Sequence, residues 1–203
     1  TGVRLEVDTH IITGSSALIR NLVKTVEEIG VDVAGVVFSG LASGFSVLSE
    51  TEKELGVVLV DIGAGTTDIC IYTDGTLSHS SVLPIGARHI TNDLAIGLRI
   101  SLESAEKIKL HLSRKKERKI LSSEDGEEKP ESGDEIDLSA LSLSEELKKV
   151  SKKTLINGII TPRMNEIFTM VGLELKRSGF AGKTPAGLVV TGGGAVTVSC
   201  IES

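Results

Sequence analysis

One stretch near the middle of the chain constrains the fold most, because it predicts three consecutive β-strands. An apolar run, Val57–Ile62, is followed by a glycine- and threonine-rich turn and by a second strand, Asp68–Thr73. An Asp74-Gly75 pair, which is a strong hairpin signal, then leads into a third strand, Leu77–Leu83. The pattern therefore predicts a meander in which each strand pairs with the next.

Before this meander, the sequence predicts short strands alternating with helices. Alternating apolar residues indicate a strand over Arg4–Ile12, and apolar residues spaced three and four apart indicate a helix over residues 15–30. A valine-rich strand near Val33–Phe38 and a helix over Leu41–Leu55 follow. Because the chain begins directly on a predicted strand, we expect it to be a fragment of a longer protein.

After the meander, helical periodicity returns. The expected elements are helices near Arg88–Leu98 and Leu102–Leu112, a helix from about Ser144 that pauses at Thr161-Pro162 and runs to Gly179, and a strand over Gly187–Val190. Only eight residues follow Ala195, too few for the helix expected behind the glycine-rich turn at that point. This is a second reason to expect a fragment.

Residues 113–143 interrupt the periodic pattern with charge. A basic cluster lies between Arg114 and Lys119, and residues 124–137 hold eight acidic residues against one lysine. This acidic stretch carries a charge of −7, so the rest of the chain, whose total is −6, sums to +1. Low apolar content and dense charge predict a mobile, solvated insertion, with regulatory docking as the alternative.

Composition excludes several classes of protein. Aromatic residues make up 2% of the chain and tryptophan is absent, so the stacking surface of a single-stranded nucleic-acid binder is not expected. The sequence has neither a run of about 18 apolar residues nor a signal-peptide pattern. Cys70 and Cys200 are too few for a disulfide framework. We expect a cytoplasmic protein that binds no nucleic acid.

The turn after the first predicted meander strand has the composition of a phosphate loop. Its residues are Asp61, Gly63, Ala64, Gly65, Thr66 and Thr67. Glycines let the backbone approach an anion closely and point N–H groups at it, and threonine hydroxyls add donors. Asp61 is the expected ligand of a water molecule bound to Mg²⁺, which takes few carboxylates directly. The alternative is a plain glycine hairpin with a capping aspartate.

Two further motifs fit a nucleotide. Gly192, Gly193 and Gly194 follow the last predicted strand, where consecutive glycines would let a flat adenine or ribose lie on the backbone. Glu106 and Lys109 are three residues apart on one predicted helix, so a carboxylate for ribose hydroxyls would lie beside an ammonium group. The alternative for this pair is a plain surface ion pair.

Other site motifs are absent from the sequence. It contains no P-loop motif and no dinucleotide fingerprint, and its four histidines lack ligand spacing. No catalytic residue can be assigned.

The order of these elements resembles the superfamily of actin, sugar kinases and heat-shock chaperones, and most closely the FtsA family of bacterial cell-division proteins. Val57–Lys109 is similar to that family throughout, including HITNDLAIGL at His89–Leu98. His10–Val33 resembles the end of the family's small inserted subdomain, and Gly187–Ala195 resembles its adenosine motif. The resemblance implies an α/β fold: an actin-like, ribonuclease H-like lobe with a mixed sheet flanked by helices, plus the end of a small inserted α/β subdomain.

The resemblance also implies a division of the chain. The implied parts are the end of the inserted subdomain at 1–38, the crossing helix of the first lobe at 39–55, the second-lobe core with the phosphate hairpin at 56–100, a helical upper subdomain at 101–185 that contains the charged insertion 113–143, and a return to the core with the adenosine motif at 186–203. The family's first phosphate loop and its C-terminal amphipathic membrane helix have no counterpart in this sequence.

The function implied by the resemblance is that of an ATP-binding cytoskeletal adaptor of cell division. Such a protein polymerises, binds the tubulin-like Z-ring protein FtsZ through its second lobe, and joins it to the inner membrane at the division site. ATP and Mg²⁺ are the implied cofactors, and ATPase activity is expected to be weak or absent because half of the hydrolytic site has no counterpart here. The alternatives are an actin-like pilus-assembly adaptor and a sugar or acid kinase of the same superfamily.

A docking surface for the tubulin-like partner is also expected. Its positions are Arg99, Lys107, Lys152, Arg163 and Glu166, flanked by Met164 and Met170. The resemblance implies that the partner offers a short acidic and apolar C-terminal peptide, which basic residues would match in sign. Flexible methionines suit a protein contact, and the alternative is that they fill the core.

Overall fold

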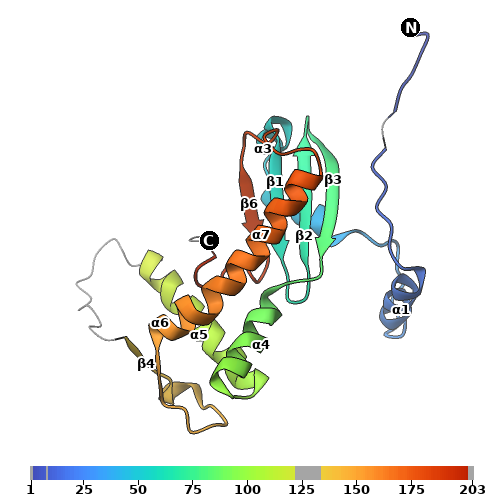
Figure 1. Cartoon of the computed structure of the whole chain (residues 1–203). Coiled ribbons are helices and arrows are strands. Elements are labelled where there is room, and N and C mark those ends of the chain that lie inside the picture. The colour runs from blue at the N-terminus through green and yellow to red at the C-terminus, as the bar shows by residue number, and fades with distance from the viewer. Residues whose placement is uncertain (1, 8, 122–133, 201–203) are drawn as a thin grey trace.

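A computed structural model describes residues 2–7, 9–121 and 134–200 of the chain (Figure 1). Its centre is a mixed sheet with the strand order β3-β2-β1-β6. The strands are β1 (Val57–Ile62), β2 (Thr67–Thr73), β3 (Thr76–Leu83) and β6 (Leu188–Thr191). The first three pair antiparallel in chain order, and β6 joins β1 in parallel. The predicted meander and the mixed α/β sheet are confirmed.

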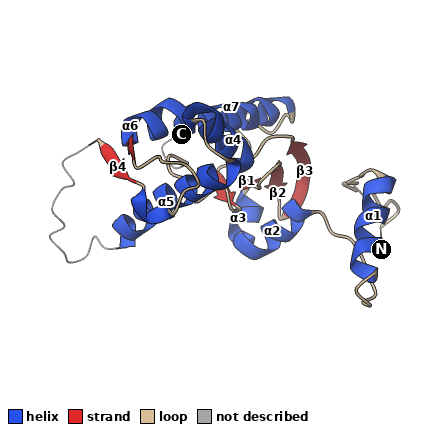
Figure 2. Ribbon diagram, turned by 90° about the horizontal axis from the view of Figure 1, so that it is seen from below, coloured by secondary structure: helices blue, strands red, loops and turns tan. Residues whose placement is uncertain are grey.

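Strand β1 is apolar on both faces, so the sheet is covered on both sides. Val58, Val60 and Ile62 belong to the larger core, which includes residues of α4, α5 and α7. Val57 and Leu59 belong to a smaller core on the opposite face, where α2 packs. Figure 2 shows α7 on one side of the strands and α2 and α3 on the other. Because side chains alternate along a strand, this arrangement fixes the face of the sheet on which each residue of β1 and β2 lies.

The helix predicted over Leu41–Leu55 is wrong in one respect, because the structure has two helices there, α2 (Ser39–Val47) and α3 (Glu50–Leu55). Ser49 separates them as the N-cap of α3, and its backbone N–H donates to Glu52 Oε2 at 2.7 Å while Glu52 N donates to Ser49 Oγ at 3.3 Å. This reciprocal capping box satisfies the first N–H groups of α3 and starts it as a new helix.

The strands predicted over Arg4–Ile12 and Val33–Phe38 are wrong for the residues described there, which pair with no strand. A strand is stable only when a neighbouring strand takes its backbone hydrogen bonds. The described part of the first segment reaches β3 through a side-chain contact, His10 Nε2 to Ser80 Oγ at 2.9 Å, but forms no backbone ladder with it. The predicted helix between them is confirmed as α1 (Ser16–Glu27), with Ser15 as its N-cap. It stands apart from the sheet, and none of its residues is buried (Figure 1).

Helices α4 (Ala87–Leu98) and α5 (Leu102–Leu121) follow the meander. The predicted end of the second helix, Leu112, is wrong, because α5 continues through the start of the predicted insertion. Residues 122–133 lie outside the described residues, so the predicted mobility of the acidic stretch is untested there.

The second half of the predicted insertion is ordered instead of being a plain solvated loop. Strands β4 (Glu135–Asp137) and β5 (Lys149–Ser151) form a small hairpin around a 3-10 helix, η1 (Ser139–Leu141). Ile136 and Leu138 are buried in the larger core, which explains why this part packs.

The helix predicted from Ser144 begins later, at Lys152. Helix α6 (Lys152–Leu155) runs through a π-helix, η2 (Ile156–Ile160), into α7 (Thr161–Arg177). Pro162 therefore does not start a separate helix. Proline has no N–H to donate, so the regular hydrogen-bond ladder is interrupted at Pro162, shortly after the π-helix. Gly179, with φ +77°, lies just beyond the end of α7, as predicted.

Within the described ranges, no helix is long and apolar enough to cross a lipid bilayer. The subdomain boundaries inferred from the resemblance remain predictions.

Candidate functional site

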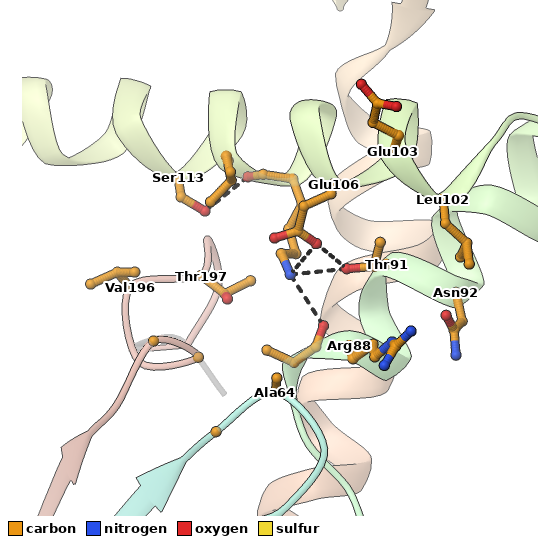
Figure 3. Close-up of a pocket in the computed structure, with 16 residues that line it drawn as sticks. Ala64, Arg88, Thr91, Asn92, Leu102, Glu103, Glu106, Ser113, Val196 and Thr197 are labelled. Atoms are coloured by element: carbon orange, nitrogen blue, oxygen red, sulfur yellow. Dashed lines mark hydrogen bonds and ion pairs between the residues drawn. The ribbon is translucent and has the colours of Figure 1, made fainter. Parts of the chain in front are cut away.

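A pocket of about 510 Å³ lies where the turn after β1 meets the turn after β6 (Figure 3). Its other walls come from α4 and α5. Because β1 and β6 are parallel, both turns leave from the same edge of the sheet. The carboxyl ends of parallel strands are the usual ligand-binding edge of an α/β sheet.

The pocket brings together all three motifs that the sequence singles out. Six of the predicted site residues line it: Gly63, Ala64, Glu106, Lys109, Gly193 and Gly194. The other five do not line it: Asp61, Gly65, Thr66, Thr67 and Gly192. Segments far apart in the sequence thus form one concave surface.

The turn after β1 is held by the N-terminus of α4. Ala87 N donates to Gly63 O at 2.9 Å, and Arg88 N donates to Ala64 O at 2.8 Å. The preceding residue, Gly86, packs so closely that an added Cβ would lie 2.6 Å from Gly63 O and 2.7 Å from Ala64 O. Only glycine fits there without moving the turn. Ala64 lacks a positive φ, so alanine is accommodated in this turn without backbone strain.

The turn after β6 is tied to β1 in a similar way. Gly194 N donates to Ile62 O at 2.8 Å, and a Cβ on Gly194 would overlap the Ile62 side chain. Gly192 has φ +86°, and a Cβ there would overlap Asp61 Oδ1. At Gly193, by contrast, a Cβ would meet no atom within 4 Å, so the backbone there is open to the pocket.

Asp61 lies beside the pocket and faces α2, as the alternation along β1 requires. Its Oδ2 accepts a hydrogen bond of 2.5 Å from Ser43 Oγ. Asp68, its direct cross-strand partner on β2, accepts one from Ser39 Oγ. Burial, together with the charges of Asp68 and Asp61, raises the pKa of the Cys70 thiol on the same face to about 12. Two carboxylates therefore share this edge of the sheet.

Asp61 and Asp68 fit a magnesium site only if water molecules and phosphate oxygens supply the other ligands. Among the described residues, no group of three or more histidine, cysteine, aspartate or glutamate side chains could hold a metal ion. Mg²⁺ commonly keeps several waters and needs one or two carboxylates when phosphate oxygens supply the rest. Asp61 and Asp68 fit that role and do not form an all-protein cage. Thr67 has a structural role, since its buried hydroxyl donates to Ile85 O at 2.8 Å.

Glu106 and Lys109 form a network with Thr91 of α4. Lys109 Nζ lies 2.8 Å from Glu106 Oε2 and donates to Thr91 Oγ1 at 2.9 Å. Thr91 Oγ1 donates to Glu106 Oε2 at 2.5 Å. Burial disfavours the charged form of Glu106, but the hydrogen bonds from Lys109 and Thr91 and the charge of Lys109 outweigh it and lower the pKa of the carboxyl group. The pair is more than the plain surface ion pair that the sequence left open.

Several lining residues were missed by the sequence interpretation. Thr91 is the clearest example, and the sequence did contain a sign of its role. It is a polar residue on the buried stripe of α4, together with Ala87, Ile90, Leu94 and Ala95. The apolar lining was also missed. It comes from exposed leucine and valine side chains at Leu102, Leu110 and Val196.

A second pocket, of about 330 Å³, lies between α4, η2 and α7. Arg163 lines it and donates to Asp93 twice, from Nε to Oδ2 at 2.6 Å and from Nη2 to Oδ1 at 2.9 Å. A third donor, Nη1, binds Glu166. Ile96 and Ile159 contribute apolar side chains.

The structure changes which of the expected docking residues lie at this pocket. Met164 is fully buried and Met170 packs against the larger core, so both methionines are core residues, as the alternative held. Of the charged positions, Arg163 and Glu166 line the second pocket, whereas Lys107 pairs with Glu103 at 2.9 Å on α5. Arg99 and Lys152 do not line it.

Comparisons with known proteins show the family and the fold of this chain. The family model described as "Cell division protein FtsA" matches residues 58–186. The cell division protein FtsA of Pseudomonas aeruginosa is 39% identical over 202 residues, which is 100% of this chain and 46% of that protein. The cell division protein FtsA of Bacillus subtilis is 38% identical over 192 residues, covering 95% of this chain and 41% of the relative. The chain thus spans about half the length of the curated relatives it matches.

A solved structure shows the same fold. MreB5 of Spiroplasma citri bound to AMPPNP has a TM-score of 0.66 at 21% identity, covering 92% of this chain and 56% of MreB5. A likeness at this level of identity shows an actin-like fold, whereas the family match extends over most of the sheet and the helices around the pocket. The chain belongs to the FtsA family of cell division proteins.

Proposed function

We propose that the full-length protein is an ATP-binding, actin-like adaptor of bacterial cell division. The convergence of three sequence motifs on one pocket of about 510 Å³ supports this most strongly. The turn at Gly63 and Ala64 would receive the phosphates, Glu106 and Lys109 the ribose hydroxyls, and the open backbone at Gly193 the adenosine. The exposed apolar side chains of Leu102, Leu110 and Val196 suit the faces of a purine base.

Magnesium belongs to the same proposal. Asp61 and Asp68 would hold the ion through its bound water molecules, and the ion would neutralise phosphate charge beside the turn. Ser43 and Ser39, which donate to these carboxylates, would keep them oriented toward that edge of the sheet.

The test is calorimetric titration of Mg-ATP into the full-length protein and into its Gly193→Val variant. A Cβ added at Gly193 meets no atom within 4 Å and Gly193 lines the pocket, so we expect valine to take up ligand space, with at least about tenfold weaker binding and little change in stability. Gly65 also has open space around an added Cβ, and Gly65→Val is expected to weaken binding by blocking approach of the phosphates. Gly172→Val is the matched control, because Gly172 has equally open surroundings and lies outside the pocket. Equal affinity in the wild type and in both the Gly193 and the Gly65 variant would reject the site.

The adaptor part of the proposal assigns the second pocket to the acidic and apolar C-terminal peptide of FtsZ. Arg163 uses three of its five N–H donors on Asp93 and Glu166, which leaves two for a partner carboxylate. Ile96 is 77% exposed beside it and suits an apolar contact. The two carboxylates hold the guanidinium in place and give the three side chains a formal charge of −1, so the site offers two directed N–H donors and an apolar wall, without net positive charge.

Polymerisation and attachment to the inner membrane at the division site complete the proposal. Membership of the family supports these two parts. Phosphorylation of a small sugar by the full-length protein would overturn the adaptor assignment in favour of a kinase.

A further inference from the structure

Thr91 occupies a place in the larger pocket that only a hydroxyl can fill. Its side chain is buried at the contact of α4 with α5, where it accepts a hydrogen bond from Lys109 Nζ and donates one to Glu106 Oε2 (Figure 3). A group that must both accept and donate between a cation and an anion is supplied by threonine or serine and by no apolar residue of the same shape.

Thr91 supplies one of the two contacts that fix the Glu106 carboxylate. The other is Lys109, three residues further along α5, whose side chain is 9% exposed and also donates to Ala87 O at 3.4 Å, whereas the Glu106 side chain is 44% exposed. An ion pair with one long, rotatable and partly exposed side chain restrains that side chain only weakly on its own. Thr91 is β-branched and buried, so its own rotamer is restricted. Its hydroxyl therefore holds the flexible Glu106 carboxylate in one position.

The helix that carries Thr91 is itself anchored to the phosphate-loop turn. Backbone N–H groups of Ala87 and Arg88 bind the carbonyls of Gly63 and Ala64, one helical turn before Thr91. The hydroxyl of Thr91 thus links the position of the turn to the position of Glu106. The contacts of the carboxylate with Thr91 and Lys109 both use Oε2, which leaves Oε1 available to a ligand in the pocket that Glu106 lines.

We propose that Thr91 is a positioning residue that aims Glu106 at the ribose hydroxyls of a bound nucleotide and so makes the pocket prefer ribonucleotides to 2′-deoxynucleotides. The inference rests on the proposed function, because it concerns the same pocket. It adds that the preference for the sugar depends on a residue that does not itself contact the sugar.

The experiment compares Mg-ATP with Mg-2′-dATP by calorimetry in the full-length protein. The wild type is expected to bind ATP about tenfold more tightly, which is the effect of one hydrogen bond to a charged group. Thr91→Val keeps the shape and removes the hydroxyl, so ATP affinity should fall and the ratio of the two affinities should approach one. Thr91→Ser restores the hydroxyl and should keep the ratio within about twofold of the wild type.

Thr169→Val is the matched control. Thr169 lies on the exposed side of α7, and its hydroxyl binds only the carbonyl of Asn165 in its own helix, so this change should leave both affinities unchanged. If Thr91→Val does not fold, Thr91→Ala is compared with Thr91→Ser in the same way.

The outcomes separate the two proposals. A wild type that binds ATP, with a ratio that Thr91→Val leaves intact, would overturn the role of Thr91. The same holds for a wild type that binds ATP and 2′-dATP equally. A wild type that binds neither nucleotide would reject the proposed function itself.

Discussion

The two sides of α4 line pockets of different chemistry. One side, with Thr91 and Asn92, lines the larger pocket, where glycine-rich turns bring backbone close to the cavity. The other side, with Asp93, Ile96 and Gly97, lines the smaller pocket, whose chemistry comes from an arginine held by two carboxylates. Backbone-lined cavities suit phosphates and flat bases, and exposed side chains suit a peptide. One helix thus contributes to two pockets that share no lining residue, so single substitutions can separate them.

The largest expected effect concerns the core between the two sites. Met164→Ala should lower the free energy of unfolding by about 2–5 kcal/mol, because Met164 is fully buried in the larger core. Urea denaturation of the full-length protein measures this. Met170→Ala is the control, with a smaller loss expected since Met170 is only partly buried. If Met164→Ala instead lost peptide binding at unchanged stability, Met164 would belong to the docking surface and not to the core.

The next effect concerns the nucleotide side alone. Gly86→Ala should cost about 1–3 kcal/mol of stability, because its Cβ would press on the carbonyls of Gly63 and Ala64. It should also weaken ATP binding by displacing the turn, while peptide affinity stays unchanged. Gly172→Ala, in open surroundings on α7, is the matched control and is expected to be neutral or slightly stabilising. If Gly86→Ala matched this control in stability and ATP binding, the turn would not depend on α4.

A smaller effect isolates the peptide side. Ile96→Asp should weaken binding of the FtsZ C-terminal peptide about tenfold, because it removes an exposed apolar contact and adds like charge beside Asp93. Fluorescence anisotropy of a labelled peptide measures this. Leu173→Asp changes an equally apolar, exposed residue of α7 that does not line the pocket, and it should have no effect. A loss of ATP affinity in Ile96→Asp would show that the two sides of α4 are not separate.

The smallest effect concerns pH. The pKa of Glu106 is lowered in the folded protein, so its charged form contributes stability above pH 4.5 that is lost as pH falls through the lowered pKa. Glu106→Gln removes this contribution, so its melting temperature should fall less steeply with acid than that of the wild type. The side chain is partly exposed, which keeps the difference small. Glu103→Gln, at a more exposed position of the same helix, is the control. Identical acid profiles for the wild type and Glu106→Gln would contradict the network with Thr91 and Lys109.

Local sequence signals predicted the central sheet well. The bounds of β1 match the predicted run, Val57–Ile62, and the Asp74-Gly75 turn has the positive φ values, +51° and +76°, that such a hairpin requires. Elements whose stability depends on distant partners were harder to predict. Residues 4–12 alternate like a strand, but alternation cannot supply the neighbouring strand that the described part of this segment lacks.

For the larger pocket, the sequence predicted the glycine turns and the Glu106–Lys109 pair but not what holds them. The roles of Gly86 and Thr91 depend on close packing between α4 and the turn or α5, and no spacing within one segment encodes such a contact. Conversely, the sequence left Met164 open between a docking surface and the core, because helical periodicity does not tell which partly apolar face is covered.

Hydrogen–deuterium exchange of the full-length protein, with Mg-ATP and with the FtsZ peptide added separately, tests the two-site account most directly. We expect ATP to slow exchange in the turns at 63–66 and 192–197 and to leave 156–166 unchanged. We expect the peptide to slow exchange at 156–166 and to leave both turns unchanged. Protection of 156–166 by ATP, or no protection of either turn, would contradict the assignment of the larger pocket to the nucleotide.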